Sequence, residues 1–345
     1  MKKLIWLVLL VIIALGIVAG RNFFDKAPQP PVDTMRVQND INEEEAPQQK
    51  LESAVSSPLV QTDALLAHLQ KLNFQRYTDA ERASARSYIT AELKKYGFKP
   101  KLQNFGQGIN IVAERPGTDK TAGSILVGAH YDTVYQSPGA DDNASGVAVV
   151  LEVARLLAQP TPRGLQLVLF DKEETGLLGS QAYVKKAKNI QKNLRGAVVM
   201  DMVSYACYTP GCQKYPPTLP ITPPSDKGDF LTVVGDIEHS PLLNSFQNNA
   251  SKQANLPAVL TVPIPLKGLL TPDTLRSDHA PFWYQGIGAV LVTDTANLRT
   301  PHYHQPSDKP ETIDRNFFVG SAQIIVNATN NLLKSSNDLK TPPSS

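Results

Sequence analysis

Apolar positions recur with a helical period near the start of the folded part of the chain. Between Asp63 and Gly97, leucine, isoleucine, alanine and tyrosine lie three or four residues apart, which predicts two scaffold helices that end at Gly97. The stretch from Ile109 to Ala113 instead places apolar residues at alternate positions, a pattern typical of a strand. We expect this short stretch to form an edge strand.

The rest of the chain alternates continuous apolar runs, typical of buried strands, with amphipathic helical segments. The predicted strands are 125–129, 165–170, 197–200, 230–234 and 289–292. The predicted helices are 146–158, 177–188, 242–254 and 317–333, and Pro-rich connections interrupt the pattern at 210–224 and again after 254. Strands that alternate with helices predict a three-layer α/β/α sandwich around a mixed, mainly parallel central sheet.

The N-terminus has a pattern of its own. Lys2 and Lys3 precede an unbroken apolar run from Leu4 to Gly20, and Arg21 follows it. A basic start and an apolar run of this length lie near the border between a secretory signal and a membrane span. We therefore expect residues 1–20 to be a signal peptide or an N-terminal membrane anchor. The protein would then be periplasmic or otherwise extracytoplasmic, either membrane-anchored or secreted.

Composition divides the remaining residues into a linker, a domain and a tail. Residues 21–58 are rich in proline, glutamine and glutamate and poor in large apolar side chains, so they predict a disordered linker. Residues 59–335 carry the strand and helix pattern and are predicted to form one catalytic domain. Residues 336–345 are predicted to be a disordered tail. Apolar residues make up 41% of the chain, which is enough for a sizeable core.

Charge and cysteine content narrow the classes of function. The net charge of the chain is +2 and no basic blocks occur, which argues against a nucleic-acid-binding surface. The two cysteines, Cys207 and Cys212, lack the partners of a zinc finger. They would close a small disulfide loop in an oxidising compartment and remain thiols in the cytosol, so the sequence leaves both states open.

Acidic and histidine side chains follow the ends of the predicted core strands. They are His130 with Asp132, Asp171 with Glu173 and Glu174, Asp201, Asp294, and the nearby His302 and His304. Asp141 and Asp142 stand between the first of these strands and its helix. Sites in open α/β sheets lie at the carboxyl ends of the strands, so we expect these side chains to meet at one edge. Carboxylates gathered there would repel one another unless a cation lies between them, which indicates a divalent metal pair.

Each of these features has a simpler interpretation when it is taken alone. A His-x-Asp after a strand is commonly a surface pair, and paired glutamates usually begin a solvated helix. Asp141 or Asp142 would also be a favourable cap for the helix that follows. The combination favours a metal site, because the acids and histidines come in order and each stands at or just after a strand end.

With these residues in view, the sequence resembles a known family, the dizinc exopeptidases of clan MH, and most closely its secreted bacterial leucyl-type aminopeptidases. The resemblance covers about residues 60 to 335, and its motifs are specific in combination. They are HYD at 130–132, GADDNASG at 139–146, the glutamate pair at 173–174, VVMDM at 198–202, SDHAPF at 277–282 and YHQPSD at 303–308. Departures such as Lys172 before the glutamate pair leave the metal motifs intact and the substrate specificity open.

The resemblance implies two zinc ions per chain. The five ligands that it implies are His130, Asp141, Glu174, Asp201 and His304. Asp141 would bridge both ions. Glu174 and His304 would complete one metal site, and His130 and Asp201 would complete the other. His279 and His302 compete for the last ligand position, but the family's ligand precedes a short turn that ends in aspartate, which favours His304.

The same resemblance assigns roles around the metals. Two ions about 3.5–4 Å apart share a hydroxide that attacks the peptide carbonyl, and imidazole and carboxylate ligands suit zinc. Glu173 would be the general base, and Asp132 would hold the distal nitrogen of His130. Tyr303 would donate a hydroxyl to the oxyanion. Asp142 would orient the bridging acid through an unusual peptide bond.

We therefore expect a zinc-dependent aminopeptidase that acts on peptide substrates; the sequence does not determine its oligomeric state. A carboxypeptidase or dipeptidase of the same clan is the nearest alternative, in which Arg276 or Arg299 would bind the free carboxylate. A glutaminyl cyclase shares the implied fold and resembles the chain at SDHAPF, but it usually keeps one zinc. A non-catalytic, metal-stabilised ectodomain is disfavoured because Glu173 is kept beside Glu174.

Overall fold

The computed structural model describes residues 58–186, 193–250 and 256–341, which belong to one compact unit, Val55–Ser345. The predicted signal or anchor at 1–20 and the predicted linker up to residue 57 lie outside the described residues. Within the described ranges, every helix is too short or too polar to cross a bilayer.

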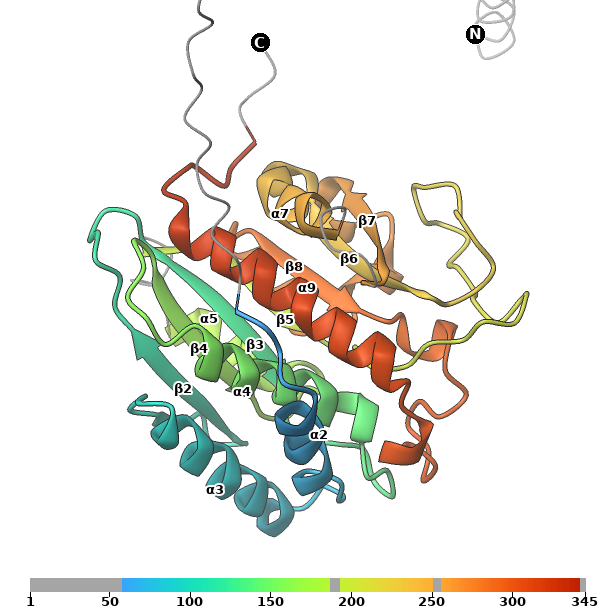
Figure 1. Cartoon of the computed structure of the whole chain (residues 1–345), viewed down its shortest axis with the longest axis horizontal. Coiled ribbons are helices and arrows are strands. Elements are labelled where there is room, and N and C mark those ends of the chain that lie inside the picture. The colour runs from blue at the N-terminus through green and yellow to red at the C-terminus, as the bar shows by residue number, and fades with distance from the viewer. Residues whose placement is uncertain (1–57, 187–192, 251–255, 342–345) are drawn as a thin grey trace, which may run out of the picture. The chain divides into compact units, whose positions relative to one another are not determined.

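An eight-stranded mixed sheet forms the middle layer of the domain (Figure 1). In spatial order the strands are β1 (Lys101–Asn104), β2 (Ile109–Arg115), β4 (Gly164–Phe170), β3 (Ser124–His130), β5 (Leu194–Met200), β8 (Ala289–Thr293), β6 (Phe230–Asp236) and β7 (Ala258–Ile264). The strands β4, β3, β5 and β8 run parallel, so their carboxyl ends share one edge. β2 and β6 run antiparallel to this group on its two sides.

Helices cover both faces of the sheet and complete the predicted three-layer sandwich. One face carries α2 (Thr62–Lys71), α3 (Asp79–Lys95), α4 (Gly146–Leu156), α7 (Ser240–Ala250) and α9 (Arg315–Lys334), which lie in front of the sheet in Figure 1. The other face carries α5 (Leu178–Lys186) and α8 (Ala280–Tyr284). Side chains alternate between the faces of a strand, so Leu126 and Val127 of β3 pack into opposite cores.

Three local expectations differ from the structure. β2 is not an edge strand, because β1 pairs outside it; the polar sequence KLQN of β1 gives no apolar run to detect. β7 occupies part of the expected Pro-rich linker, where Pro263 is tolerated because β7 is itself an edge strand. The SDHAPF motif runs into the short helix α8, which the sequence pattern did not predict.

A disulfide and the C-terminal segment are also defined. Cys207 and Cys212 are joined in a disulfide, which closes the short loop after β5. The predicted disordered tail is wrong as far as residue 341. Leu339 is buried, and the backbone N–H of Thr341 donates to the carbonyl oxygen of Glu238 at 2.8 Å, so this part of the tail packs on the domain.

Candidate metal centre

Three neighbouring strands deliver acidic and histidine side chains to one edge of the sheet. His130 is the last residue of β3, Asp201 directly follows β5, and Glu173 and Glu174 come shortly after β4. Because these strands are parallel, the predicted meeting of their carboxyl ends is confirmed. Atoms of His130, Glu173 and Asp201 that could bind a metal lie within 4.8 Å of one another.

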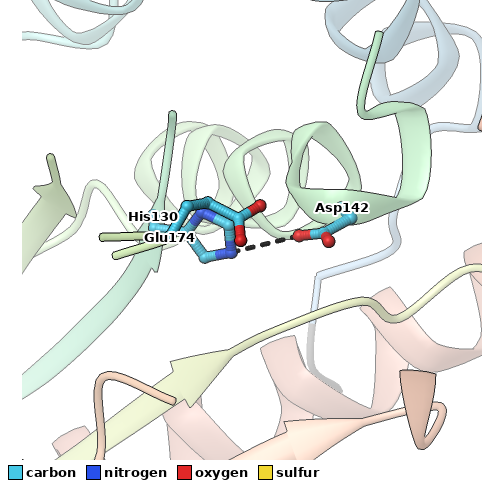
Figure 2. A group of neighbouring side chains, drawn as sticks. All are labelled: His130, Asp142 and Glu174. Atoms are coloured by element: carbon cyan, nitrogen blue, oxygen red, sulfur yellow. Dashed lines mark ion pairs between the residues drawn. The ribbon is translucent and has the colours of Figure 1, made fainter. Parts of the chain in front are cut away.

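Asp142 lies between two histidines. Its Oδ1 is 3.3 Å from Nε2 of His130, and its Oδ2 is 3.3 Å from Nε2 of His304. His130 Nε2 is also 3.5 Å from Oδ1 of Asp201, and His304 Nε2 is 3.0 Å from Oε2 of Glu174. Figure 2 shows His130, Asp142 and Glu174 gathered at this point. The Asp142 carboxylate therefore joins two half-sites, His130 with Asp201 and His304 with Glu174.

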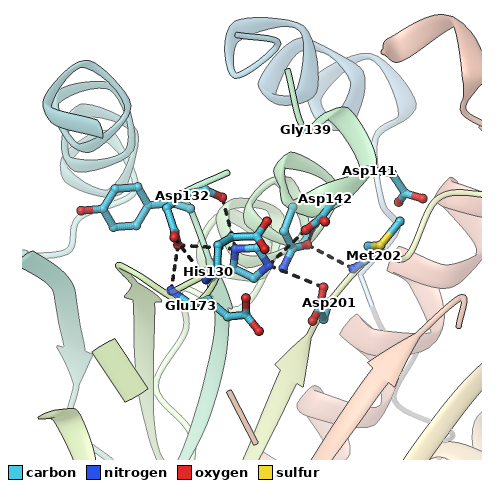
Figure 3. A network of polar contacts seen from close by, with 12 residues as sticks. His130, Asp132, Gly139, Asp141, Asp142, Glu173, Asp201 and Met202 are labelled. Atoms are coloured by element: carbon cyan, nitrogen blue, oxygen red, sulfur yellow. Dashed lines mark hydrogen bonds and ion pairs between the residues drawn. The ribbon is translucent and has the colours of Figure 1, made fainter. Parts of the chain in front are cut away.

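The prediction that Asp141 takes the bridging position is wrong. The Asp141 carboxylate lies away from His130 (Figure 3), and its Oδ1 accepts hydrogen bonds from the hydroxyl and the backbone N–H of Ser204 at 2.5 and 3.1 Å. Asp142, which was expected only to orient the bridging acid, takes the position between the two histidines. The unusual peptide bond expected in this motif is the cis bond between Asp142 and Asn143.

Asp308 sets the direction in which Asp142 points. The backbone N–H of Asp141 donates to one carboxylate oxygen of Asp308 at 2.8 Å, and the N–H of Asp142 donates to the other at 3.0 Å. Asp308 is fully buried, and its carbonyl oxygen also accepts from the N–H of Ala140 at 3.2 Å. These bonds fix the backbone of the GADDNASG motif, so the two adjacent acids face different surroundings.

The buried guanidinium of Arg76 holds the loop that precedes Asp142. It donates to the carbonyl oxygens of Tyr131, Pro138 and Gly139 at 2.7–2.8 Å. Gly139 has a left-handed φ of 60°, and a Cβ there would lie 2.2 Å from the carbonyl oxygen of Asp142. The loop therefore needs glycine at this position to bring Asp142 to the histidines.

Asp132 connects the histidine to the glutamate pair. Its Oδ1 lies 3.6 Å from Nδ1 of His130, and its carbonyl oxygen is 3.2 Å from the same nitrogen. The expected contact with the distal nitrogen of His130 is therefore present. The Asp132 carboxylate also accepts from the backbone N–H groups of Glu173 and Glu174 at 3.1 and 3.3 Å, a positioning role that the sequence did not predict.

Burial and crowded charge shift the pKa values of the centre. Burial raises the pKa of Glu174 to about 7, and the neighbouring charge of Asp142 acts in the same direction. Burial alone would lower the pKa of His304, but its contacts with Asp142 and Glu174 outweigh burial and raise that pKa to about 10. Burial also raises the pKa of Glu173 well above its ordinary value, against the opposing charge of His130. Without a metal, protons held by these three side chains therefore reduce the negative charge of the site. The geometry of the ligands suits divalent cations, which would reduce the same charge.

The donor set fits a pair of zinc ions. Imidazole nitrogens and carboxylate oxygens are usual zinc ligands, and a bridging carboxylate offers one oxygen to each of two ions. Asp142 is placed to do this. Oε1 of Glu174 is buried without a hydrogen-bond partner, as expected for an atom whose natural partner is a cation.

The competing histidines have other partners. His302 Nδ1 lies 2.9 Å from the hydroxyl oxygen of Ser307. His279 Nε2 lies 2.8 Å from the carbonyl oxygen of Thr274, and its ring meets Trp283 edge-on. Of the three candidates, His304 is the one in contact with both Asp142 and Glu174, which agrees with the choice made from the sequence.

Two adjoining cavities of about 320 Å³ each open at the centre. The first is mostly apolar, lies against β6, β7 and β8, and is bordered by the Pro-rich segment after the disulfide. Its apolar lining includes Tyr215, Leu219, Val234, Leu260, Val262 and Leu291. The second contains Asp142, Glu173, Glu174 and His304. Asp201, Arg276 and Tyr303 line both cavities and mark the passage between them.

Tyr303 stands at this passage, beside the half-site of His304. The two rings are stacked with their centroids 3.7 Å apart. A guanidinium nitrogen of Arg276 donates to the Tyr303 hydroxyl oxygen at 3.2 Å, and another donates to Asn297 at 3.1 Å. Burial raises the pKa of Tyr303, so the hydroxyl keeps its proton and remains a hydrogen-bond donor.

Sequence reasoning missed two residues that shape the centre. Ser204, which holds Asp141 away from the histidines, lies three residues after Asp201, and that closeness was the one available signal. Arg76 lies in the connection between α2 and α3, far along the chain from every metal motif, and no local pattern marks it.

Comparison with known proteins identifies the family. A family model described as peptidase family M28 matches residues 110–329. YfbL, an uncharacterized protein of Escherichia coli, is 35% identical over 63% of this chain and 68% of its own length. A probable zinc metalloprotease of Pyrenophora tritici-repentis is 26% identical over 81% of this chain and 62% of its own length. Leucine aminopeptidase 1 of Trichophyton rubrum is 27% identical over 71% of this chain and 64% of its own length. The chain thus spans about two thirds of these relatives' length.

Solved structures show the same fold. The LapA aminopeptidase of Legionella pneumophila superposes with a TM-score of 0.64 at 19% identity, over 80% of this chain and 73% of LapA. The glutaminyl cyclase of Porphyromonas gingivalis superposes with a TM-score of 0.59 at 20% identity, over 80% of this chain and 99% of the cyclase. The family model spans β2 to α9 and includes every acid and histidine of the centre described above, and the chain belongs to peptidase family M28.

Proposed function

We propose that this protein is an aminopeptidase that holds two zinc ions and removes N-terminal residues from peptides. The observation that carries the proposal is the Asp142 carboxylate, which gives one oxygen to the half-site of His130 and the other to that of His304. The relatives named as a zinc metalloprotease and a leucine aminopeptidase support the metal and the reaction class.

Five side chains would hold the ions. They are His130 and Asp201 in one half-site, His304 and Glu174 in the other, and Asp142 between them. Zinc bound there would supply Lewis acidity, polarising the scissile carbonyl and lowering the pKa of water.

Glu173 is the residue placed to move a proton. Glu173 is 8% exposed and lines the cavity at the centre. Burial raises the pKa of its carboxyl group above the ordinary value, which makes the carboxylate a stronger base. We assign to Glu173 the removal of a proton from the attacking water and its delivery to the leaving amine. Asp132 holds the backbone of Glu173 in position for this transfer.

Tyr303 would stabilise the oxyanion. Arg276 donates to the lone pairs of the Tyr303 oxygen, so the hydroxyl proton is free to turn toward the substrate. This assignment is supported by the position of Tyr303, which lines both cavities and would lie beside a peptide bond held at their junction.

The junction of the cavities also accounts for recognition of the N-terminus. An ammonium group paired with Asp201 would leave the first side chain of the peptide at the mouth of the apolar cavity, because Asp201 lines both spaces. The cavity's apolar lining favours peptides whose first residue is large and apolar.

The arginines do not favour a carboxypeptidase. Arg299 is 5% exposed and donates to one side chain and two backbone carbonyl groups, so it cannot reach a substrate carboxylate. Arg276 is engaged with Tyr303 and Asn297. Both arginines therefore have partners within the chain.

We further propose that the protein works outside the cytoplasm, on peptides, held to a membrane or secreted through residues 1–20. The disulfide between Cys207 and Cys212 supports this location, because such bonds persist in oxidising compartments.

Zinc analysis, combined with hydrolysis of peptides that have free or blocked ends, tests the proposal. We expect two zinc ions per chain and cleavage that requires a free N-terminal amine and stops with a chelator. Cleavage that requires a free C-terminus would make the protein a carboxypeptidase. One zinc with cyclisation of N-terminal glutamine would make it a glutaminyl cyclase, whose fold it also shares.

A further inference from the structure

An apolar patch lies around the carboxyl ends of β6 and β7. Of the ten large apolar side chains that are exposed among the described residues, three lie in the short helices 237–239, 265–268 and 280–284, of which the second contacts the other two, and two more directly follow the second helix. These five define the apolar patch: Ile237 (44% exposed), Leu266 (61%), Leu269 (75%), Leu270 (63%) and Tyr284 (64%). Contiguous exposed apolar side chains of this kind usually mark an interaction surface.

Strand direction places Ile237 and Leu266 at the edge of the sheet opposite the metal centre. Ile237 directly follows β6, and Leu266 comes two residues after β7. β6 and β7 run antiparallel to β8, so their carboxyl ends lie at the edge opposite to that of His130 and Asp201. His239, beside Ile237, packs against Gly288 just before β8, which confirms the position.

The loop that carries the leucines has a defined conformation. Leu266, Lys267 and Gly268 all adopt left-handed φ values, of 52°, 52° and 80°, which are unfavourable for the two residues that are not glycine. The turn is closed by hydrogen bonds from the N–H of Leu269 to Leu266 and from that of Thr271 to Gly268. This hydrogen-bonded turn therefore holds Leu266, Leu269 and Leu270 in exposed positions.

The chemistry of the patch suits a lipid surface. Leucine side chains can enter the boundary between headgroups and acyl chains, and tyrosine is enriched at that depth. The charged groups around the patch are Lys267, which pairs with Glu238 at 3.4 Å, and Lys340 and Asp338 in the tail that packs beside Ile237. Lysine beside leucine and tyrosine matches the composition of interfacial membrane-binding segments.

The N-terminal sequence supplies the reason to choose a bilayer as the partner. An apolar run from Leu4 to Gly20 precedes the domain, and residues 21–57 connect the two. A chain of that length with the composition of a disordered linker would have a root-mean-square span of roughly 35 Å, so an inserted run would keep the domain within reach of the membrane surface. Because such a tether raises the effective concentration of the domain at the membrane surface, even a weak apolar contact with lipid would hold the domain there.

We propose that the apolar patch docks the domain on the outer face of the membrane that holds the N-terminal run. This inference stands independently of the peptidase proposal, because no residue of the metal centre takes part in it.

Vesicle binding by residues 55–345, the compact unit without the apolar run, tests the inference. The vesicles contain phosphatidylcholine and phosphatidylglycerol, and binding is followed by co-sedimentation over a range of lipid concentration. The Leu269→Ser/Leu270→Ser variant removes the two most exposed leucines of the patch. The matched control is Leu59→Ser/Leu102→Ser, whose leucines are 70% and 57% exposed outside the patch.

We expect the unmodified unit and the control to bind the vesicles, and the patch variant to lose at least about tenfold in partitioning. Hydrolysis of soluble peptides should be equal for all three proteins. Failure of the unmodified unit to bind, or equal binding by the two variants, overturns the proposal. Concentration-dependent dimers that only the patch variant abolishes would overturn it too, because the partner would then be a second copy of the chain.

Discussion

Asp141 and Asp142 are adjacent in the chain, yet their carboxylates contact different groups. Asp142 contacts His130 and His304, whereas Asp141 accepts hydrogen bonds from Ser204 in the protein interior. The N–H groups of both acids donate to Asp308, so one carboxylate holds the backbone of both residues while their side chains contact different groups. This relationship provides a matched pair of variants.

Asp142→Asn should abolish zinc binding at one or both half-sites, because an amide cannot give a charged oxygen to each of two ions. We expect hydrolysis to fall at least about a hundredfold. Asp141→Asn should keep both ions, since its carboxylate lies elsewhere, and the change also removes one of two buried acids that oppose each other's charge, Asp141 and Asp294. Metal analysis of both variants measures the difference. Loss of zinc in Asp141→Asn and not in Asp142→Asn would restore the assignment made from the sequence.

Tyr303→Phe should lower kcat by about 10²–10³-fold with a smaller effect on KM, because the hydroxyl is needed when the oxyanion forms. Arg276→Met should lower kcat less, because Arg276 acts by orienting that hydroxyl. In the double variant the effect of Arg276→Met should largely disappear. Additive losses would show that the two residues act separately, and Arg276→Lys is the control that keeps the charge.

Zinc should stabilise the protein more as the pH rises. Without metal, the pKa of Glu174 is about 7 in the folded chain, above its ordinary value of 4.5, so the folded state holds more protons over this window. The metal-free protein therefore loses stability as the pH rises through the window, and zinc replaces the protons that are lost. Melting temperatures with zinc and with chelator, compared at about pH 5 and about pH 8, should differ more at the higher pH. An equal difference at both values would contradict this explanation.

Thr232 provides a way to test the apolar cavity as the pocket for the first side chain. It lines the cavity, and its hydroxyl is buried without a hydrogen-bond partner, so Thr232→Phe fills space without removing a bond. We expect kcat/KM for peptides that begin with leucine or phenylalanine to fall about 10–200-fold, and that for alanine to change little. Equal losses for all three peptides would show that the first side chain binds elsewhere. Thr232→Val, which keeps the volume, should behave like the unmodified protein.

The central sheet and most metal-centre residues could be predicted because they depend on local patterns. Strands such as β3 are continuous apolar runs, and the acids and histidines stand at their ends. β1 and β7 escaped prediction because an edge strand needs neither an apolar run nor a full set of backbone donors. The sheet order, which makes β2 internal, depends on pairing between distant segments.

The choice between Asp141 and Asp142 could not be made from the sequence for a related reason. Neighbouring side chains point to different sides, so the direction depends on what holds the backbone. Here Asp308 holds the backbone N–H groups of both acids and Ser204 holds the Asp141 carboxylate, and both partners lie far along the chain. The contribution of Arg76 was invisible for the same reason, since it binds backbone carbonyl groups that any residue carries.

Zinc content and peptide hydrolysis of Glu173→Gln, measured on the same preparation, test the central claim most directly. Glu173 lines the centre beside the proposed ligands, so the variant should keep two zinc ions per chain. Its hydrolysis of a peptide with a free N-terminal amine should fall by about 10²–10⁴-fold, because the group that moves the proton is gone. A variant that holds two ions and cleaves as fast as the unmodified protein would contradict the account.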